Sequence, residues 1–357
     1  MAKFTGQLKA NEIFGALFNM IISQQVFTDN IKGTYSSLVD AAREEGSLYG
    51  DTKLYYATDC LKSSEWGDDE EAANLLKLYR PKAPECQAIT LDKFRQIALT
   101  TDNYLTKRAW GDEGAFASFN SAMKAWIPDT KKIYDATTYN SFIGTVKTTK
   151  GKQAREIDLT AATTDLTGIE KANMRAQTIA QSIADLLVEM KDVSRDFNDY
   201  GFLRSYGDEE IKVIWNSKYV NEIKKIDLPA IFHKEGLMDK FEQYVLPSRY
   251  FGDIQAAAGT GDGAAIRSLV EKDYGNTHCF PGDIIPKGQA FLANEAYKVN
   301  DKVICKIVTK LPPFMSAFEV GTSFFNPKSL TETNYLTWGH NTLEYLSGKP
   351  LITITEK

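Results

Sequence analysis

Cysteine and histidine are scarce in this chain of 357 residues, which has four of the first and three of the second. No Cys-x-x-Cys pair occurs and the histidines are scattered, so neither a disulfide scaffold nor a structural zinc site is expected. His278 and Cys279 are adjacent, and we interpret them as a surface imidazole beside a buried thiol. Free thiols in this number are typical of synthesis in a reducing cytoplasm.

Excess positive charge is also missing, because the formal net charge is −5. Proteins that read DNA or RNA usually present a basic surface, so no dedicated nucleic-acid-reading module is expected. No apolar run is long enough to span a bilayer. The segment 13–22 comes nearest, but Asn19 interrupts it and no small-residue cleavage site follows. We therefore predict no contact with a membrane.

Catalytic motifs are absent as well. The sequence has no Gly-x-Ser-x-Gly elbow and no His-Glu-x-x-His. Gly259–Gly263 imitates a nucleotide-binding loop, and a helix is predicted after it over Ala264–Glu271. A poor strand precedes this loop, and the Gly-Lys-Ser/Thr of a Walker loop is missing, so a surface loop is the simpler interpretation. We predict no catalytic, cofactor-binding or metal-binding residues and no enzyme; a nucleotide-using enzyme with the Gly259–Gly263 loop remains the alternative from another class.

What the sequence does contain is typical of a globular chain, with 43% hydrophobic and 25% charged residues. These values exclude disordered and collagen-like classes. Aromatic residues are abundant, at 19 Phe, 17 Tyr and 5 Trp, and such side chains carry much of the energy of cores and interfaces. The length indicates two domains, or one domain with excursions.

Two excursions are predicted near the N-terminus. Residues 13–24 form an amphipathic helix whose apolar face, with Leu17 at its centre, lacks a partner surface. Residues 47–98 form a long two-stranded arm, because strand-forming segments at 52–58 and 87–92 flank an acidic tip at Gly67–Glu71. A structureless stretch of that length inside a compact domain is unusual and is commonly functional.

Helical periodicity predicts two long helices further along. The first runs from Phe116 to Thr137, where Pro128 should kink or split it. The second begins at a capping box, Thr167–Glu170, and carries an apolar stripe to Met190. A short strand at Ile211–Trp215 and a helix at Asn216–Ile226 follow.

The last third is β-rich and ties the C-terminus into a sheet. Residues 303–309 alternate as a strand, and Trp338–Leu346 and Leu351–Thr355 are predicted to close the chain as strands. The fold class is therefore α+β. Excursions of this kind bury apolar surface poorly within one subunit, which favours a symmetric homo-oligomer. The candidates for contacts between subunits are Leu17, Tyr55, Tyr56 and Trp66, since buried aromatic anchors dominate many interfaces.

The chain resembles the major capsid (head) proteins of tailed bacteriophages, with the Hong Kong 97 capsid fold, and among them those of short-tailed phages (the podovirus type). The segments that carry this resemblance are spread in order along nearly the whole chain: 87–94 with 99–102 and 107–110, 129–139, 213–219, 228–236 and 247–252. Each segment alone is weak, and their order carries the resemblance.

The resemblance implies a layout. Residues 1–46 correspond to an N-terminal arm and 47–98 to the extended loop that lies over a neighbouring subunit. Residues 99–145 correspond to the peripheral domain's spine helix, 146–326 to the axial domain, and 327–357 to returning peripheral strands.

It also implies a function: self-assembly as hexamers and pentamers into an icosahedral head enclosing packaged double-stranded DNA, without sequence-specific binding. The expected partners are further copies of the chain, a portal protein and minor head proteins. A separate scaffolding protein, or none, is expected because the arm-like region starts almost at Met1. No motif identifies a cross-linking lysine–asparagine pair. The expected location is the virion, after assembly in the host cytoplasm. An encapsulin-type bacterial nanocompartment is the alternative within the same fold.

Overall fold

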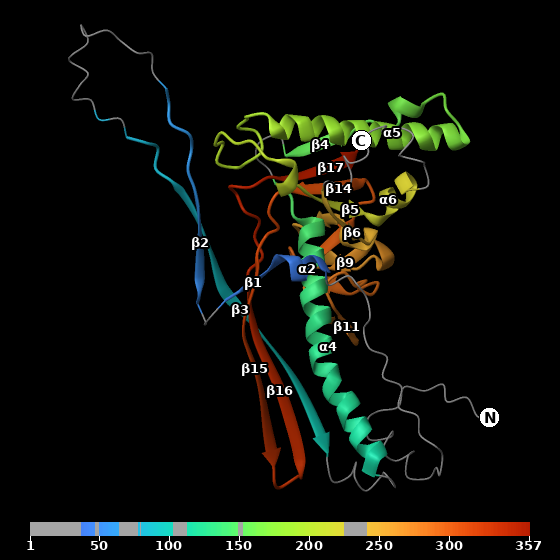
Figure 1. Ribbon diagram of the computed structural model, residues 1–357. Coiled ribbons are helices and arrows are strands. Elements are labelled where there is room, and N and C mark those ends of the chain that lie inside the picture. The colour runs from blue at the N-terminus through green and yellow to red at the C-terminus, as the bar shows by residue number, and fades with distance from the viewer. Residues whose placement is uncertain are drawn as a thin grey trace.

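The computed structural model describes residues 37–46, 50–63, 78, 80–102, 113–148, 153–224 and 241–357. Two five-stranded sheets organise this part of the chain, and one long helix connects them (Figure 1). One sheet, which we label the axial sheet, forms the core of a compact body that we call the axial body. The other, which we label the peripheral sheet, is drawn out along the helix and continues into the arm.

The axial sheet has the strand order β4-β17-β14-β5-β6. Its strands are β4 (Ala154–Ile157), β17 (Leu351–Glu356), β14 (Val303–Val308), β5 (Lys212–Asn216) and β6 (Glu242–Leu246). The central strand β14 is antiparallel to both β17 and β5, and all six of its residues are buried. The alternation read in the sequence therefore has no exposed face, since both faces of the sheet are covered.

Helix α5 (Gly168–Lys191) covers one face, and α6 (Ser217–Lys224) follows β5 (Figure 1). The predicted stripe of α5 is confirmed: its members from Ala176 to Met190 are buried against β5, β14 and β17. The predicted capping box is wrong, because Thr167 is the N-cap but its side chain makes no capping hydrogen bond.

The end of α4 (Glu113–Thr145) covers the other face, where Tyr139 and Ile143 pack against Ile214 and Val308. Lys306 of β14 fastens this end of the helix, because its buried Nζ donates to the carbonyl oxygens of Ile143 and Val146 at 2.7 and 2.6 Å. A cation is favourable at a helix C-terminus. Burial nevertheless lowers the pKa of Lys306 to about 7.

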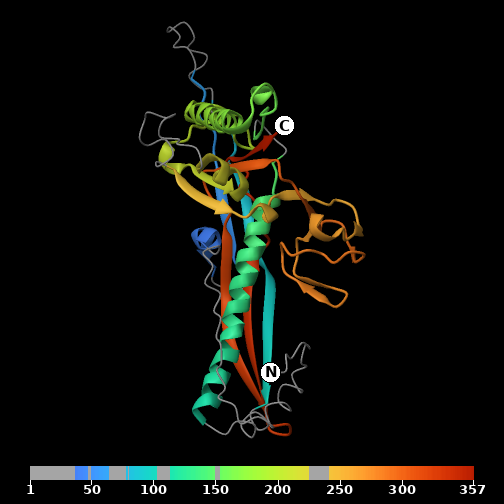
Figure 2. The same ribbon diagram turned by 90° about the vertical axis from the view of Figure 1, so that its right-hand side faces the viewer.

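The peripheral sheet has the strand order β1-β15-β16-β3-β2. Its strands are β1 (Arg43–Glu45), β15 (Phe314–Asn326), β16 (Thr331–Asn341), β3 (Glu85–Asp102) and β2 (Thr52–Ala57). Helix α4 runs along one face of this sheet, and the short helix α2 (Ser37–Ala42) packs on α4 (Figures 1 and 2). The 18-residue strand β3 pairs with β2 at one end and with β16 over the rest.

Helix α4 is continuous through Pro128, so of the two predicted outcomes the split is wrong and the kink stays a prediction. Proline removes one backbone donor and crowds the preceding turn. Here ion pairs from the helix to the peripheral sheet hold both sides of that turn, from Lys124 to Glu332 at 3.9 Å and from Lys131 to Glu319 at 3.1 Å. Tertiary contacts therefore outweigh the local preference.

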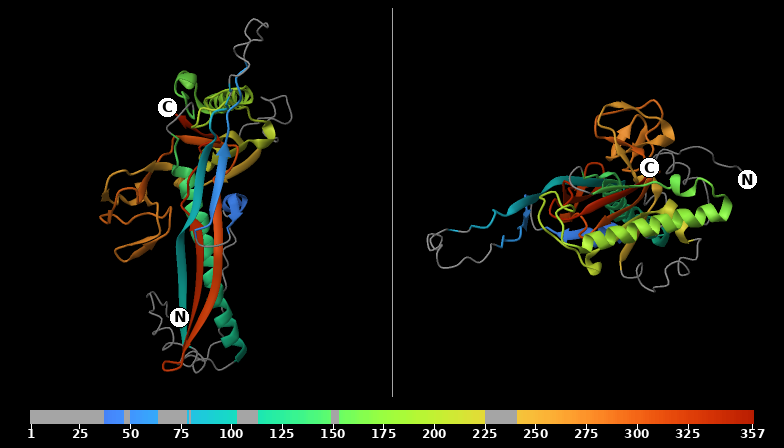
Figure 3. Two further views of the ribbon diagram at one scale, coloured as in Figure 1. Left: turned by 90° about the vertical axis from the view of Figure 1, so that its left-hand side faces the viewer. Right: turned by 90° about the horizontal axis from the view of Figure 1, so that it is seen from above.

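A small β subdomain, residues 252–299, projects to one side of the molecule (Figures 2 and 3). Its paired strands are β7 (Gly252–Ile254) and β9 (Ile266–Ser268) on β13 (Ala296–Val299), β8 (Gly259–Thr260) with β12 (Ala290–Phe291), and β10 (Lys272–Tyr274) with β11 (Thr277–Cys279). It has its own core of Ile266, Tyr274, Cys279, Ile285, Phe291 and Ala296. The predicted helix over Ala264–Glu271 is wrong, because that range holds the end of a short 3-10 helix, η6 (Gly263–Ala265), then β9 and a bend that leads into β10.

The C-terminal prediction is correct for β17, which pairs with β14 and β4. The other closing strand is displaced: β16 ends at Asn341, so residues 342–346 are not a strand. Asn341 explains this end, because its buried side chain bonds the backbone at Pro313, Thr342 and Met315 instead of continuing the ladder.

Candidate intersubunit site

Two of the four predicted contact residues lie on strand β2 of the arm, and the other two, Leu17 and Trp66, lie outside the described residues. Successive side chains of a strand point to opposite faces. Tyr55 accordingly turns inward and is partly buried, whereas Tyr56 and Leu54 are 66% and 52% exposed. Their role between subunits stays a prediction, with Tyr56 the better placed of the two tyrosines.

Tyr55 is held in a charged cluster of its own chain. Its hydroxyl donates to Glu44 at 2.8 Å, and Lys53 and Lys310 each lie 3.2 Å from the same carboxylate. Burial alone would raise the pKa of Glu44, but these hydrogen bonds and the Lys310 charge lower it. Burial and the neighbouring Glu44 raise the pKa of Tyr55. The cluster ties the arm's base to β1 and to the loop after β14.

The base of the arm also has an apolar anchor. Ile89 and Leu91 of β3 are buried with Met315, Ala317 and Leu346 of the same chain. The expectation that the whole arm contacts another subunit rather than its own core is therefore wrong for this part. The strand pair is stabilised at its base by its own peripheral sheet, and just beyond it Thr58 and Asp59 bond to Arg204 and Arg195 of the loop after α5. From the base, the described strands lead away from the body (Figure 3).

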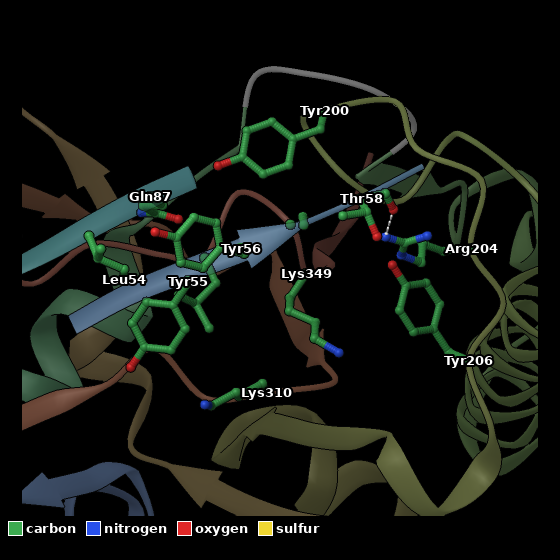
Figure 4. Close-up of a pocket in the computed structure, with 13 residues that line it drawn as sticks. Leu54, Tyr55, Tyr56, Thr58, Gln87, Tyr200, Arg204, Tyr206, Lys310 and Lys349 are labelled. Atoms are coloured by element: carbon green, nitrogen blue, oxygen red, sulfur yellow. Dashed lines mark hydrogen bonds between the residues drawn. The ribbon is translucent and has the colours of Figure 1, made fainter. Parts of the chain in front are cut away.

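Beside the arm's base lies a cavity of about 400 Å³ (Figure 4). The arm, the loop that follows α5 and the loop before β17 form its walls. The lining residues are Leu54, Tyr55, Tyr56, Ala57, Thr58, Gln87, Tyr200, Arg204, Tyr206, Lys310, Leu346, Gly348 and Lys349.

The polar groups of this cavity are mostly donors. Arg204 donates to the carbonyl oxygens of Leu203 and Thr58, and Asp59 beyond it accepts from Arg195 and from the Leu203 backbone. Tyr206 is 3% exposed, its ring lies in the axial core, and burial raises its pKa to about 12. The Asn198 side chain lies beside its hydroxyl and opposes this rise, but within the described residues the hydroxyl has no hydrogen-bond partner of normal geometry.

A second polar cluster joins α4 to the peripheral sheet. Tyr134 Oη lies 2.8 Å from His340 Nε2 and accepts from Arg95 Nε at 3.1 Å. His340 Nδ1 donates to the Asn341 carbonyl at 2.8 Å, so Nε2 is the acceptor in the neutral ring, and burial lowers the pKa of His340. Tyr134 and His340 are buried. This arrangement is therefore a joint between helix and sheet rather than a reactive centre.

The Gly259–Gly263 loop, which imitates a nucleotide-binding loop in the sequence, does not have the geometry of one. Gly261 lies so close to its neighbours that an added Cβ would be 2.4 Å from the Pro286 carbonyl oxygen, and its N–H donates to Gln289. The glycine loop is thus packed against residues 286–289, and it is followed by a three-residue 3-10 helix (Gly263–Ala265) instead of the predicted helix whose N-terminus could bind a phosphate. Among the described residues no three metal-binding side chains cluster, and no helix there is long and apolar enough to cross a membrane. Cys279 is buried and His278 half-exposed, as predicted.

Sequence reasoning found Tyr55 and Tyr56 but missed Arg204, Tyr206 and Lys349. The arm and these residues are separated by more than a hundred positions and meet only because the axial sheet places two loops beside β2. No local pattern marks them, since each is an ordinary loop or strand-edge residue in its own segment.

Comparisons place this architecture among solved structures, whereas no protein-family model and no curated protein matches the sequence. A chain from the structure of the head fiber and inner core protein gp22 of native bacteriophage P68 has a TM-score of 0.63 at 11% identity, covering 95% of this chain and 89% of its own. A chain from the capsid of Staphylococcus phage Andhra has a TM-score of 0.57 at 10% identity, covering 95% and 87%. Identity this low reports on the fold. The chain therefore has the α+β capsid fold of tailed-bacteriophage head proteins, as its resemblance to them predicts.

Proposed function

We propose that this chain is the major subunit of a tailed-phage head, assembling as hexamers and pentamers into an icosahedral shell around double-stranded DNA. The observation that supports this most is the extent of the fold similarity, which covers 95% of the chain in both comparisons. Fold alone does not define function, so the proposal rests also on the exposed apolar and aromatic side chains of the arm.

The arm supports assembly. A two-stranded ribbon on its own is marginal in water. Next to its anchored base this ribbon presents Leu54 and Tyr56 to solvent, and a neighbouring subunit would cover them. In the proposed layout residues 1–46 are the N-terminal arm, 47–98 the extended loop, 99–145 the spine helix, 146–326 the axial domain and 327–357 the returning strands. Two strands depart from these bounds, because β15 lies in the peripheral sheet and β17 lies in the axial sheet. Leu17 and Trp66 would add contacts from the same two arms.

The role is structural rather than enzymatic in this proposal. The partners would be further copies of the chain, a separate scaffolding protein, a portal protein and minor head proteins, with the DNA held without sequence-specific contacts. The location would be the virion, after assembly in the host cytoplasm.

Electron microscopy of the expressed full chain, with and without co-expressed phage proteins, tests the proposal. Closed shells or six- and five-membered capsomers are the expected result. Analytical ultracentrifugation that finds only monomer at high concentration, scaffold included, would overturn it. Nuclease-protected DNA in particles from infected cells separates a head from an encapsulin-type compartment, which would hold protein cargo.

A further inference from the structure

The cavity beside the arm's base carries positive charge that the described part of the chain leaves without an acidic partner. Lys349 makes no side-chain hydrogen bond or ion pair there, and Arg204 bonds only to backbone carbonyl oxygens. A guanidinium has five donors, so Arg204 keeps several for another group. Lys310, at the rim, shares Glu44 with Lys53. Figure 4 shows the Arg204 and Lys349 side chains on the same side of the cavity as Tyr206.

The second observation is the hydroxyl of Tyr206. A buried polar group without a partner is costly, and such groups in native structures call for an explanation. The ring is fixed in the axial core, and its hydroxyl lies in the cavity wall beside Arg204 (Figure 4). A carboxylate entering the cavity would accept from this hydroxyl and from both cations, and would satisfy all three groups at once.

The sequence holds a segment of matching chemistry. Residues 64–77, which lie outside the described residues, contain five carboxylates, Glu65, Asp68, Asp69, Glu70 and Glu71, against one lysine, together with Trp66. The cavity offers tyrosine rings at Tyr56 and Tyr200 for an aromatic side chain. The segment and the cavity therefore match in aromatic side chains as well as in charge.

A second copy is the expected source of this segment. The arm leads away from the body along β2 and its described continuation (Figure 1). A ring of identical subunits needs two different complementary patches on each copy, one receiving the other. An acidic arm segment and a cationic cavity in the same chain are such a pair.

We propose that the cavity receives the acidic segment 64–77 of a neighbouring copy, with carboxylates bound by Arg204, Lys349 and the Tyr206 hydroxyl. This inference rests on the proposed function. It identifies a receptor site for the arm of a neighbouring copy. It also predicts that added salt weakens assembly, because salt screens ion pairs at the rim of an interface.

Charge exchange in the full chain tests it. The cavity variant is Arg204→Glu with Lys349→Glu, the segment variant is Asp69→Lys with Glu70→Lys, and the control is Lys302→Glu with Lys328→Glu, which reverses two exposed lysines elsewhere. The cavity and segment variants alone should each yield at least about tenfold fewer capsomers by native mass spectrometry, and the control should match the wild type. Mixing the two variants should restore six-membered rings containing equal numbers of each.

The mixture distinguishes the sources of the segment. If each chain bound its own segment, combining all four substitutions in one chain would restore assembly but mixing the variants would not, and the second-copy proposal would be overturned. Unchanged assembly by the cavity variant would overturn the inference while leaving the proposed function intact. A wild-type chain that never forms capsomers would instead contradict the proposed function.

Tyr206→Phe provides a variant that should fold. It removes only the unpartnered hydroxyl, so the thermal midpoint of the unassembled chain should be unchanged or higher, while capsomer yield falls about threefold. A peptide of residues 64–77 should also bind the wild-type chain more tightly than this variant, and a peptide with Asn and Gln in place of its Asp and Glu should not bind. Equal yield and equal peptide binding by Tyr206→Phe would contradict a role for the hydroxyl.

Discussion

The strands of the axial sheet and of the arm differ in how many of their faces are buried. Strand β14 has six buried residues between two covering layers, whereas the residues of β2 alternate between partly buried and exposed. Both are strands of similar length with strong β-formers. The difference shows that the axial body completes its own core, while the arm completes only one face and leaves the other to be covered.

Removing the outer arm should have the largest effect, because it should abolish assembly while leaving the axial body folded. Replacing Ser63–Pro84 by a short Gly-Ser turn should leave a soluble chain with native-like circular dichroism, because the anchor of Ile89 and Leu91 is retained and shortening a loop changes closure entropy little. Closed shells should be lost entirely in electron micrographs. Unfolding of this variant would place the outer arm in the core, and complete particles would show that it is not needed for closure.

Truncating one buried side chain of the axial sheet and one exposed side chain of the arm should give very different changes in the free energy of unfolding. Ile352→Ala, at a fully buried position of β17, should lower the free energy of unfolding by about 2–5 kcal/mol. Tyr56→Ala should change it by less than about 0.5 kcal/mol. Chemical denaturation of the unassembled chain gives both values. A large loss with Tyr56→Ala would mean that the arm's outer face is part of the subunit's own stability.

The junction between the two regions should respond to pH through Lys306. Its pKa is lowered to about 7 in the folded chain, so the unfolded chain binds more protons between pH 7 and the ordinary lysine pKa. The free energy of unfolding should therefore rise with pH above 7, with a contribution of up to about 1.4 kcal/mol per pH unit. Below pH 7 this contribution to the slope disappears.

Lys306→Met should flatten that slope, whatever it does to stability at a single pH. Lys302→Met is the matched control, since Lys302 is an exposed lysine of the turn before β14 and should keep the wild-type slope. Equal slopes for the two variants would contradict the assignment to Lys306.

The smallest expected effect concerns the β subdomain, which touches the peripheral sheet through one ion pair, Arg95 with Glu271 at 3.7 Å. His278 lies 3.0 Å from Glu271 and 2.7 Å from Asp273, and these hydrogen bonds raise its pKa. Its stabilising contribution is present at low pH and is lost as the pH rises through the folded-state pKa.

His278→Gln should remove that pH dependence at a cost below about 0.5 kcal/mol, since the side chain is half exposed and solvent screens the pairs. Hydrogen exchange of residues 266–285 at pH 5.5 and 8 is the measurement. Identical exchange by the wild type at both pH values would show that this pairing does not hold the subdomain.

The sequence predicted most reliably the elements whose pattern is local. The α5 stripe, the strand at 212–216, the paired arm strands and the final strand all follow from periodicity over a few residues. Errors arose where distant contacts decide, as at Pro128, where α4 lies along the peripheral sheet, and at residues 264–271, where the small subdomain pairs Ile266–Ser268 with β13 as a strand. The layout of the whole chain came from the resemblance to head proteins rather than from these patterns.

The candidate site was predictable only in part for the same reason. Tyr55 and Tyr56 were found because they lie in a recognisable strand. Arg204, Tyr206 and Lys349 become neighbours of that strand only after the axial sheet has formed, and the sequence around each gives no sign of it.

Strand β3 has a mechanical consequence. It runs unbroken through 18 residues, about 60 Å at the usual rise, and belongs to the arm at one end and to the peripheral sheet at the other. A pull on the arm along this strand loads the ladder between β3 and β16 in shear, so that its hydrogen bonds resist together instead of opening one after another. Tension arriving from a neighbouring molecule would be spread along the full length of the sheet and into α4. The base of the arm would therefore transmit the load without bending.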